Sequence, residues 1–181
     1  MRTHHLLAVC TTAALLTGCS ESSSDAPSPQ TAPTQTTAPQ QAPQWMITDM
    51  PSDILDVGWA KASVSEGDTV TLKGRIGGRV DPMSTDMAVF IIVDSAVPSC
   101  HDKAHDSCPT PWDYCCEPRD SLMANNATIQ LVGDDGAPLA IDLQQHGFQP
   151  LDEVVIQGTV APRPSDAVLI VKATHIGHTS S

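Results

Sequence analysis

One short segment of this chain holds most of the side chains that could carry chemistry. Residues 100–118 read CHDKAHDSCPTPWDYCCEP and contain four of the six cysteines, two of the seven histidines and the only tyrosine. Thiols can pair as disulfides, exchange electrons or ligate a metal ion. This segment, which we call the cysteine loop, therefore allows three kinds of chemistry.

The first hypothesis is that two structural disulfides hold the loop. An even number of closely spaced cysteines facing an oxidising compartment is typical of a disulfide framework. A bond between the neighbours Cys115 and Cys116 would close a strained ring. We therefore expect Cys100 to pair with either of these two residues and Cys108 with the other. Each bridge would contribute about 2–4 kcal/mol to a loop that has no core of its own.

The second hypothesis is a metal site. The candidate ligands are thiolates and imidazoles: Cys100, Cys108, Cys115, Cys116, His101 and His105. Such a set suits tetrahedral zinc or copper. The spacing Cys-x7-Cys-x6-Cys-Cys lacks the Cys-x2-Cys pairs typical of zinc sites, so our first expectation is no cofactor, with copper or zinc as the alternative. The third hypothesis, redox chemistry at the vicinal pair, lacks a Cys-x-x-Cys motif.

The remaining functional candidates in the loop are aromatic and acidic. Trp112 and Tyr114 are predicted either to bind a ligand as an exposed platform or to cover the disulfides. Three carboxylates offer an acid/base set, although solvated acidic loops are more common: Asp113, Glu117 and Asp120. No Ser-His-Asp arrangement or phosphate-binding loop is readable, so we predict no catalytic residues.

The N-terminus indicates the compartment. An apolar run over residues 6–16 is followed by Gly18-Cys19 and is too short to span a bilayer, which takes about 20 residues. This stretch resembles the lipobox of bacterial lipoproteins, which implies a signal peptide over residues 1–18 and acylation of Cys19. The implied partner is membrane lipid and the implied location is the extracytoplasmic cell envelope. Ser20 in place of Asp favours the outer membrane in a cell with two membranes.

The segment after the lipidated cysteine is predicted to be a tether. Residues 19–44 consist mainly of Ser, Thr, Ala, Pro and Gln with no large apolar residue, so they cannot offset the entropy of ordering. Removal of Arg2 with the signal peptide leaves eight Lys and Arg against 21 Asp and Glu, a net charge near −13. Such a charge repels phosphate backbones and excludes nucleic acid as a partner.

Strand-like sequence lies on both sides of the cysteine loop. Residues 68–80 alternate apolar and polar side chains, and Gly74, Gly77 and Gly78 lie where a long strand would bend. The expected strands are 68–80, 87–93, 127–132, 138–143, 153–160 and 167–173. A short helix is predicted near residues 54–62, and residues 144–151 are predicted to be a connector.

These strands predict an all-β domain over residues 45–181, a small antiparallel barrel that resembles an OB-fold and carries the cysteine loop as a long insert. A β-sandwich is the competing architecture. The motifs GRIGG at 74–78 and CPTPWDYCCEP at 108–118 resemble a group of secreted and lipid-anchored bacterial OB-like proteins, over roughly residues 67–176. This resemblance implies fold and compartment, and it implies no activity.

The sequence as a whole predicts a membrane-anchored envelope lipoprotein that is not an enzyme. Its disulfide-stapled loop would act as a binding or scaffold module for an envelope protein or a small ligand. The alternatives are a metal- or haem-handling protein that uses the cysteines and histidines of the loop and, third, a thiol oxidoreductase.

Overall fold

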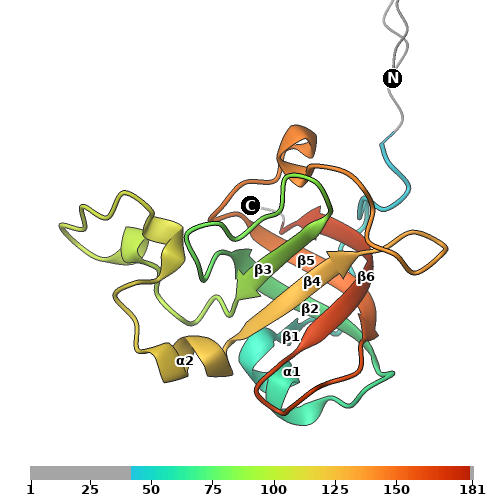
Figure 1. Cartoon of the computed structure of the whole chain (residues 1–181), viewed down its shortest axis with the longest axis horizontal. Helices are drawn as coiled ribbons and strands as arrows, with labels where there is room; N and C mark the ends of the chain where they lie inside the picture. The colour runs from blue at the N-terminus through green and yellow to red at the C-terminus, as the bar shows by residue number, and fades with distance from the viewer. Residues whose placement is uncertain (1–41, 180–181) are drawn as a thin grey trace, which may run out of the picture. The chain divides into compact units, whose positions relative to one another are not determined.

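The computed structural model describes residues 42–179 (Figure 1). The predicted signal peptide, Cys19 and the tether up to residue 41 lie outside the described residues. Within that part of the chain, no helix has both the length and the apolar character needed to cross a membrane.

Five strands close into a barrel. They are β2 (Thr69–Ile76), β3 (Val89–Val93), β4 (Asn126–Leu131), β5 (Glu153–Val160) and β6 (Ile170–His178). Their order is β2-β3-β4-β6-β5, and β5 pairs back onto β2 to complete the ring. The predicted all-β, OB-fold-like barrel with a long insert is therefore confirmed.

The pairing corrects one feature of the prediction, because the barrel is mixed and not purely antiparallel. Strands β4 and β6 run parallel, whereas the other four seams of the ring are antiparallel. The reason is geometric: strand direction cannot alternate all the way around a closed ring with an odd number of strands. A short strand β1 (Leu55–Asp56) also pairs with β2, and this second pairing is parallel.

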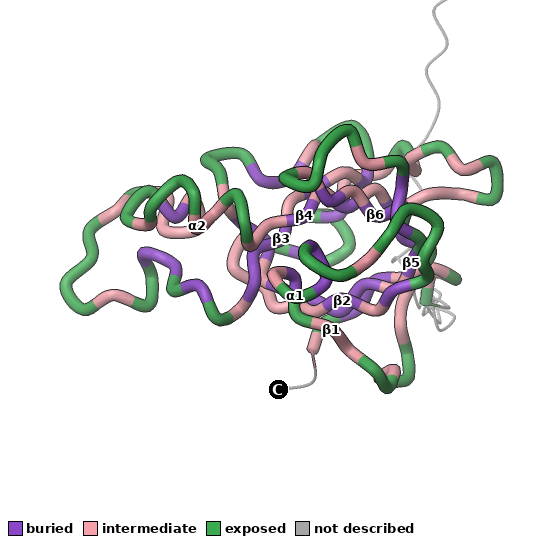
Figure 2. The backbone as a smooth tube through the Cα atoms, turned by 90° about the horizontal axis from the view of Figure 1, so that it is seen from below, coloured by how far each residue is buried: buried purple, intermediate pink, exposed green. Residues whose placement is uncertain are grey.

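The core fills the barrel because alternate residues of each strand point inward. Strand β4 alternates half-buried and buried residues throughout, as does β2 from Val70 onward. Phe90, Ile129, Phe148 and Ile156 are among the largest side chains of this core. Figure 2 shows the buried residues concentrated along the strands, while the insert is mostly exposed or half-buried.

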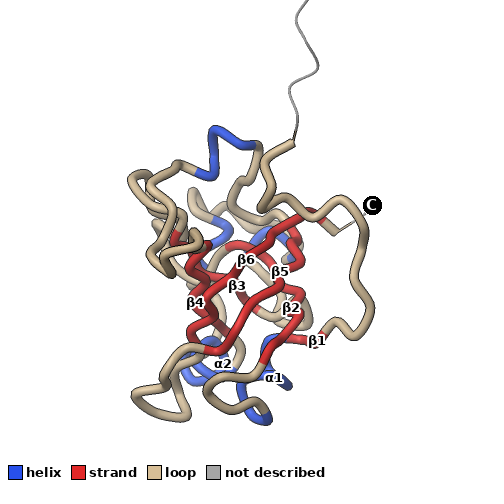
Figure 3. The backbone as a smooth tube through the Cα atoms, turned by 90° about the vertical axis from the view of Figure 1, so that its right-hand side faces the viewer, coloured by secondary structure: helices blue, strands red, loops and turns tan. Residues whose placement is uncertain are grey.

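The differences from the predicted elements are local. Residues 138–143 do not form a strand, since only Pro138 bridges Val132 before a short 3-10 helix η3 (Leu143–His146) begins. The predicted first helix starts later, as α1 (Val57–Ser63), because the two residues before it pair with β2. A further helix, α2 (Arg119–Ala124), was not predicted. Figure 3 shows these helices as short segments beside the barrel.

The cysteine loop belongs to the excursion between β3 and β4. This excursion contains two 3-10 turns, η1 (Cys100–Asp102) and η2 (Pro111–Asp113), followed by α2. It projects from one side of the barrel (Figure 1). Since the turns are short, the loop depends on contacts with the barrel to hold its shape.

Candidate metal centre in the cysteine loop

The loop is fixed to the barrel by the ring of Tyr114. This side chain is fully buried and packs with Val93, Val97 and Leu122 in a small second core. The barrel accommodates the loop at Gly77, where a Cβ atom would lie 2.8 Å from Tyr114 Cε2 and 2.6 Å from the Trp112 carbonyl oxygen. Any larger residue at this glycine would force the loop away from the barrel.

Burial of Tyr114 corrects the predicted aromatic platform. Its ring has no face open to a ligand, so it acts as an anchor for the loop. Trp112 is half-buried, and its Nε1 donates to the Val80 carbonyl at 2.8 Å. Trp112 lines a hollow of about 450 Å³ together with Met83, Gln149 and other residues. Of the two predicted ligand-binding rings, only Trp112 lines a cavity.

Arg75 provides a second attachment, through charge. This residue extends from β2, and its Nη1 donates to Asp102 at 2.5 Å and to Ser99 Oγ at 3.3 Å. The backbone N–H and the hydroxyl of Ser99 also donate to Asp102, each at 2.8 Å. Although partial burial acts in the opposite direction, the hydrogen bonds from Ser99 and Arg75 lower the pKa of Asp102. The ionised carboxylate therefore holds the turn that begins at Cys100.

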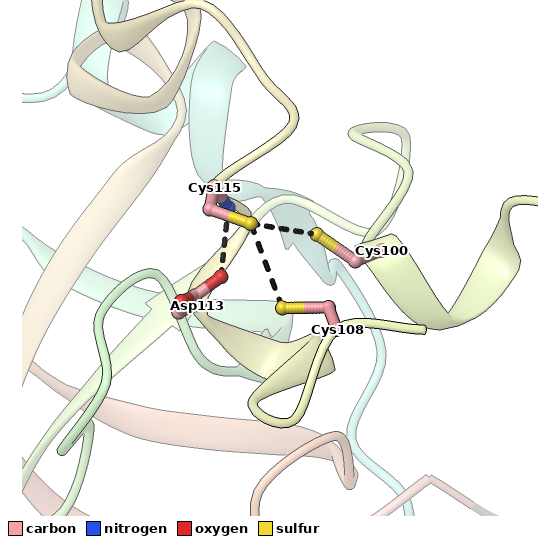
Figure 4. A group of neighbouring side chains, drawn as sticks. All are labelled: Cys100, Cys108, Asp113 and Cys115. Atoms are coloured by element: carbon pink, nitrogen blue, oxygen red, sulfur yellow. Dashed lines mark hydrogen bonds between the residues drawn. The ribbon is translucent and has the colours of Figure 1, made fainter. Parts of the chain in front are cut away.

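The four sulfurs of the loop lie together. We call this group the thiol cluster: Cys100, Cys108, Cys115 and Cys116. Cys115 Sγ lies 3.6 Å from Cys100 Sγ and 3.6 Å from Cys108 Sγ, and Figure 4 shows it in contact with both. Cys116 Sγ lies 3.3 Å from Cys100 Sγ and 3.9 Å from Cys115 Sγ. Residues far apart along the loop thus meet at one point.

The thiols are free in this structure. Their sulfur–sulfur distances of 3.3–3.9 Å exceed the roughly 2.05 Å of a disulfide bond, so neither predicted bridge is formed. Each of these distances also matches the separation of two sulfurs that share one bound ion. For metal–sulfur bonds of about 2.3 Å, the edges of a regular tetrahedron measure about 3.8 Å.

Asp113 adds a carboxylate to the cluster. A ligand atom of Asp113 and the sulfurs of Cys100, Cys108 and Cys115 all lie within 4.8 Å of one another. The carboxylate is oriented, since it accepts from the Cys115 backbone N–H at 2.8 Å and from the Thr110 hydroxyl at 2.9 Å. Burial acts to raise its pKa, but these bonds lower the pKa of Asp113 overall, so the group is ionised at neutral pH.

The protonation of Cys115 reflects this crowding. Hydrogen bonds to Cys100, Cys108 and Asp113 raise the pKa of the Cys115 thiol, because a thiolate there would stand among other sulfurs and a carboxylate. A cation reverses this balance, since a bound metal ion stabilises thiolates and displaces their protons. The arrangement of donors thus fits a positive ion better than it fits a reactive thiolate.

Other predicted site residues are not brought into this cluster. His101 and His105 belong to neither group of potential metal ligands found among the described residues. The reason is local: the turn η1 ends at Asp102 and Lys103 is extended, so the two rings do not share a helical face. Nor do the three predicted carboxylates form an acid/base set, since Glu117 instead bonds Lys103 Nζ at 2.6 Å.

Two carboxylates near the sulfurs were missed as ligands by the sequence reasoning. Asp113 was considered only as an acid or base, and Asp106 was not considered, although it lies with Cys100 and Cys116 in a second group within 4.8 Å. The signal for Asp113 was its position two residues before a cysteine, which is the geometry of an Asx turn. No sequence signal indicated Asp106.

Comparisons with known proteins add little. No family model matches the chain, and no curated protein matches it. Among solved structures, the chain is similar to a putative aspartyl-tRNA synthetase from Leishmania major Friedlin, with 14% identity and a TM-score of 0.40. The match covers 75% of this chain but only 23% of that protein, and at this TM-score it supports no conclusion about function.

The Arg75 attachment makes a testable prediction. Asp102→Asn should loosen the start of the loop without unfolding the barrel. We expect amide exchange near residues 99–103 to accelerate about fivefold, equivalent to roughly 1 kcal/mol, since the ion pair is partly exposed and worth less than a buried one. Because the pKa of Asp102 is lowered, its contribution is present at neutral pH and is lost as pH falls through that lowered value.

Asp134→Asn, in an exposed turn, serves as the matched control and should leave exchange in the loop unchanged. Equal exchange rates in Asp102→Asn and the parent chain at neutral pH would show that this carboxylate does not hold the loop.

Proposed function

We propose that this chain is a lipid-anchored protein of the cell envelope that binds and exchanges a thiophilic metal ion. One observation carries the proposal: three sulfurs and an oriented carboxylate lie within 4.8 Å of one another in a loop that the barrel holds in place. The ligands are Cys100, Cys108, Cys115 and Asp113. Three thiolates and one carboxylate suit Zn²⁺, and a shell of thiolates alone would suit either Zn²⁺ or Cu⁺.

The exposure of the ligands supports handling of the ion over a purely structural role. Cys100 is buried, Cys108 and Asp113 are half-buried, and Cys115 is exposed. An ion bound here would have one side protected by the protein and the other open to solvent. A competing ligand, such as a thiol of another protein, could therefore reach the ion and take it by exchange.

The anchor is inferred from the sequence alone. The lipobox-like end at Cys19 and the Pro-rich segment up to residue 44 support a mature protein held on lipid by its acylated cysteine. The tether would let the metal centre approach partners some distance from the membrane surface. Membrane lipid and a thiol-bearing envelope protein are the partners that this arrangement suits.

A second candidate function is the disulfide-stapled binding module. The observation that favours it is the pairing of contacts within the thiol cluster. Cys108 Sγ meets Cys115 Sγ at 3.6 Å, and Cys100 Sγ meets Cys116 Sγ at 3.3 Å. Thiol–disulfide exchange with a disulfide-bearing oxidant of the envelope, which takes up two protons and two electrons for each bond formed, would staple the loop. It would then present Trp112 and its hollow to a ligand.

The metal proposal predicts tight zinc binding by the reduced full chain in detergent. We expect one or more Zn²⁺ per chain by native mass spectrometry, and Cys108→Ser should weaken binding more than about 100-fold, beyond the 10–100-fold typical of losing an outer-shell partner. Binding should strengthen as pH rises, because the Cys115 thiol must lose its proton to solvent before its thiolate can bind the ion.

The matched control is Cys19→Ser, which removes the proposed acylated cysteine outside the described residues and should leave zinc affinity unchanged. Two disulfides and no zinc in chain purified without reductant would favour the stapled module, and no zinc in the reduced chain would refute the metal proposal.

The anchor makes a separate prediction. Cys19→Ala in the full chain should move the protein from the membrane pellet to the soluble fraction, because the residue that carries the acyl chains is gone. Cys10→Ala lies within the predicted signal peptide and should leave the fractionation unchanged. A Cys19→Ala protein that remains in the pellet would reject the lipid anchor.

A further inference from the structure

The thiol cluster contains two overlapping sets of donor atoms. Cys115 Sγ and Cys100 Sγ lie 3.6 Å apart at its centre, Cys108 Sγ lies 3.6 Å from Cys115 Sγ, and Cys116 Sγ lies 3.3 Å from Cys100 Sγ and 3.9 Å from Cys115 Sγ. Two ligands of one ion with bonds of about 2.3 Å cannot lie more than about 4.6 Å apart. Neither of the two ligand groups in the described part of the chain contains both Cys108 and Cys116.

Each of the two ligand groups has its own carboxylate. Asp113 lies with Cys108, Cys115 and Cys100, whereas Asp106 lies with Cys116 and Cys100. Cys100 belongs to both groups. Its sulfur occupies the middle of the cluster and its residue is fully buried, so it is held by the surrounding protein while the outer ligands are more exposed.

We propose that the loop holds two thiophilic ions that share the sulfur of Cys100 as a bridging thiolate. The first ion is bound by Cys108, Cys115, Asp113 and Cys100, and the second by Cys116, Asp106 and Cys100. Each coordinating thiol gives up its proton to solvent as the ion binds. This inference rests on the proposed metal-binding function and specifies its stoichiometry.

Charge favours two ions over one. Four thiolates and two carboxylates carry six negative charges within a small volume, which one divalent ion leaves mostly uncompensated. A second divalent ion offsets most of that charge, whereas the ammonium of Lys103 is already paired with Glu117. Lys103 Nζ lies 3.4 Å from the Cys116 carbonyl oxygen and 2.6 Å from Glu117 Oε1.

The second position is also the more accessible one. Cys116 and Asp106 are both exposed, whereas the first position includes two half-buried ligands. An ion that arrives from solvent or from another protein would meet the exposed position first. The shared sulfur then offers a path between the two positions, since a bridging thiolate can stay bound to an ion while its other ligands change.

The test is titration of the full chain with ¹¹³Cd²⁺, a spin-1/2 probe for zinc-like thiolate sites. A Cys10→Ser, Cys19→Ser background leaves only the thiols of the cluster. We expect two Cd²⁺ per chain by native mass spectrometry and two ¹¹³Cd resonances coupled to each other through the shared sulfur. Cys116→Ser and Cys108→Ser should each reduce the stoichiometry to one, and Cys100→Ser should abolish the coupling.

Each outcome decides between the alternatives. One Cd²⁺ per chain, unaffected by Cys116→Ser, would overturn the two-ion arrangement and leave the metal-binding proposal standing. Two uncoupled resonances that persist in Cys100→Ser would overturn the bridge. No bound Cd²⁺ in the reduced chain would overturn the proposed function itself. Asp106→Asn removes a ligand of the second ion and should reduce the stoichiometry to one, whereas the matched control Asp86→Asn, at an exposed carboxylate outside the loop, should keep two ions.

Discussion

The close packing of Tyr114 against the barrel at Gly77 is the contact on which the cysteine loop depends. A loop of this length with two 3-10 turns has little interior of its own, so its conformational entropy must be offset by contacts elsewhere. The tyrosine ring supplies apolar burial and Arg75 supplies charge-assisted hydrogen bonds to the turn beside Cys100. Because both attachments join the loop to the barrel, they hold together the parts of the loop that carry the sulfurs.

The electrostatics of the loop complement this attachment. Away from the cluster, the carboxylates of the loop have cationic partners: Asp102 with Arg75, and Glu117 with Lys103. Within the cluster, Asp113 is held by N–H and O–H donors and lies beside the Cys115 thiol, whose pKa is raised. A cation is the component that would stabilise these groups together. We therefore expect the carboxylates of the loop to contribute to function mainly within the thiol cluster.

The sequence predicted the fold well because alternation and glycine placement are local signals. Strand β5 matches its predicted bounds, and β3 and β4 differ by two residues or fewer. The prediction of a strand at 138–143 was wrong. A turn motif indicates that the chain reverses direction, but it does not show that the returning segment pairs with the strand before the turn. The sequence shows that four cysteines lie close together along the chain. It does not show how their sulfurs are arranged, because that depends on Tyr114 packing against the barrel and on Arg75 of the barrel binding the loop. Asp106 shows the same limit, as only the folded loop brings it near the sulfurs.

X-ray absorption spectroscopy at the zinc edge of the loaded full chain tests the central claim most directly, because it reads the atoms that touch the ion. A first shell dominated by sulfur at about 2.3 Å, with a minor oxygen contribution near 2.0–2.2 Å, is the result that the thiol cluster and its carboxylates predict. A shell of nitrogen and oxygen alone would place the ion elsewhere on the protein and would contradict the assignment of the cysteine loop as a metal centre.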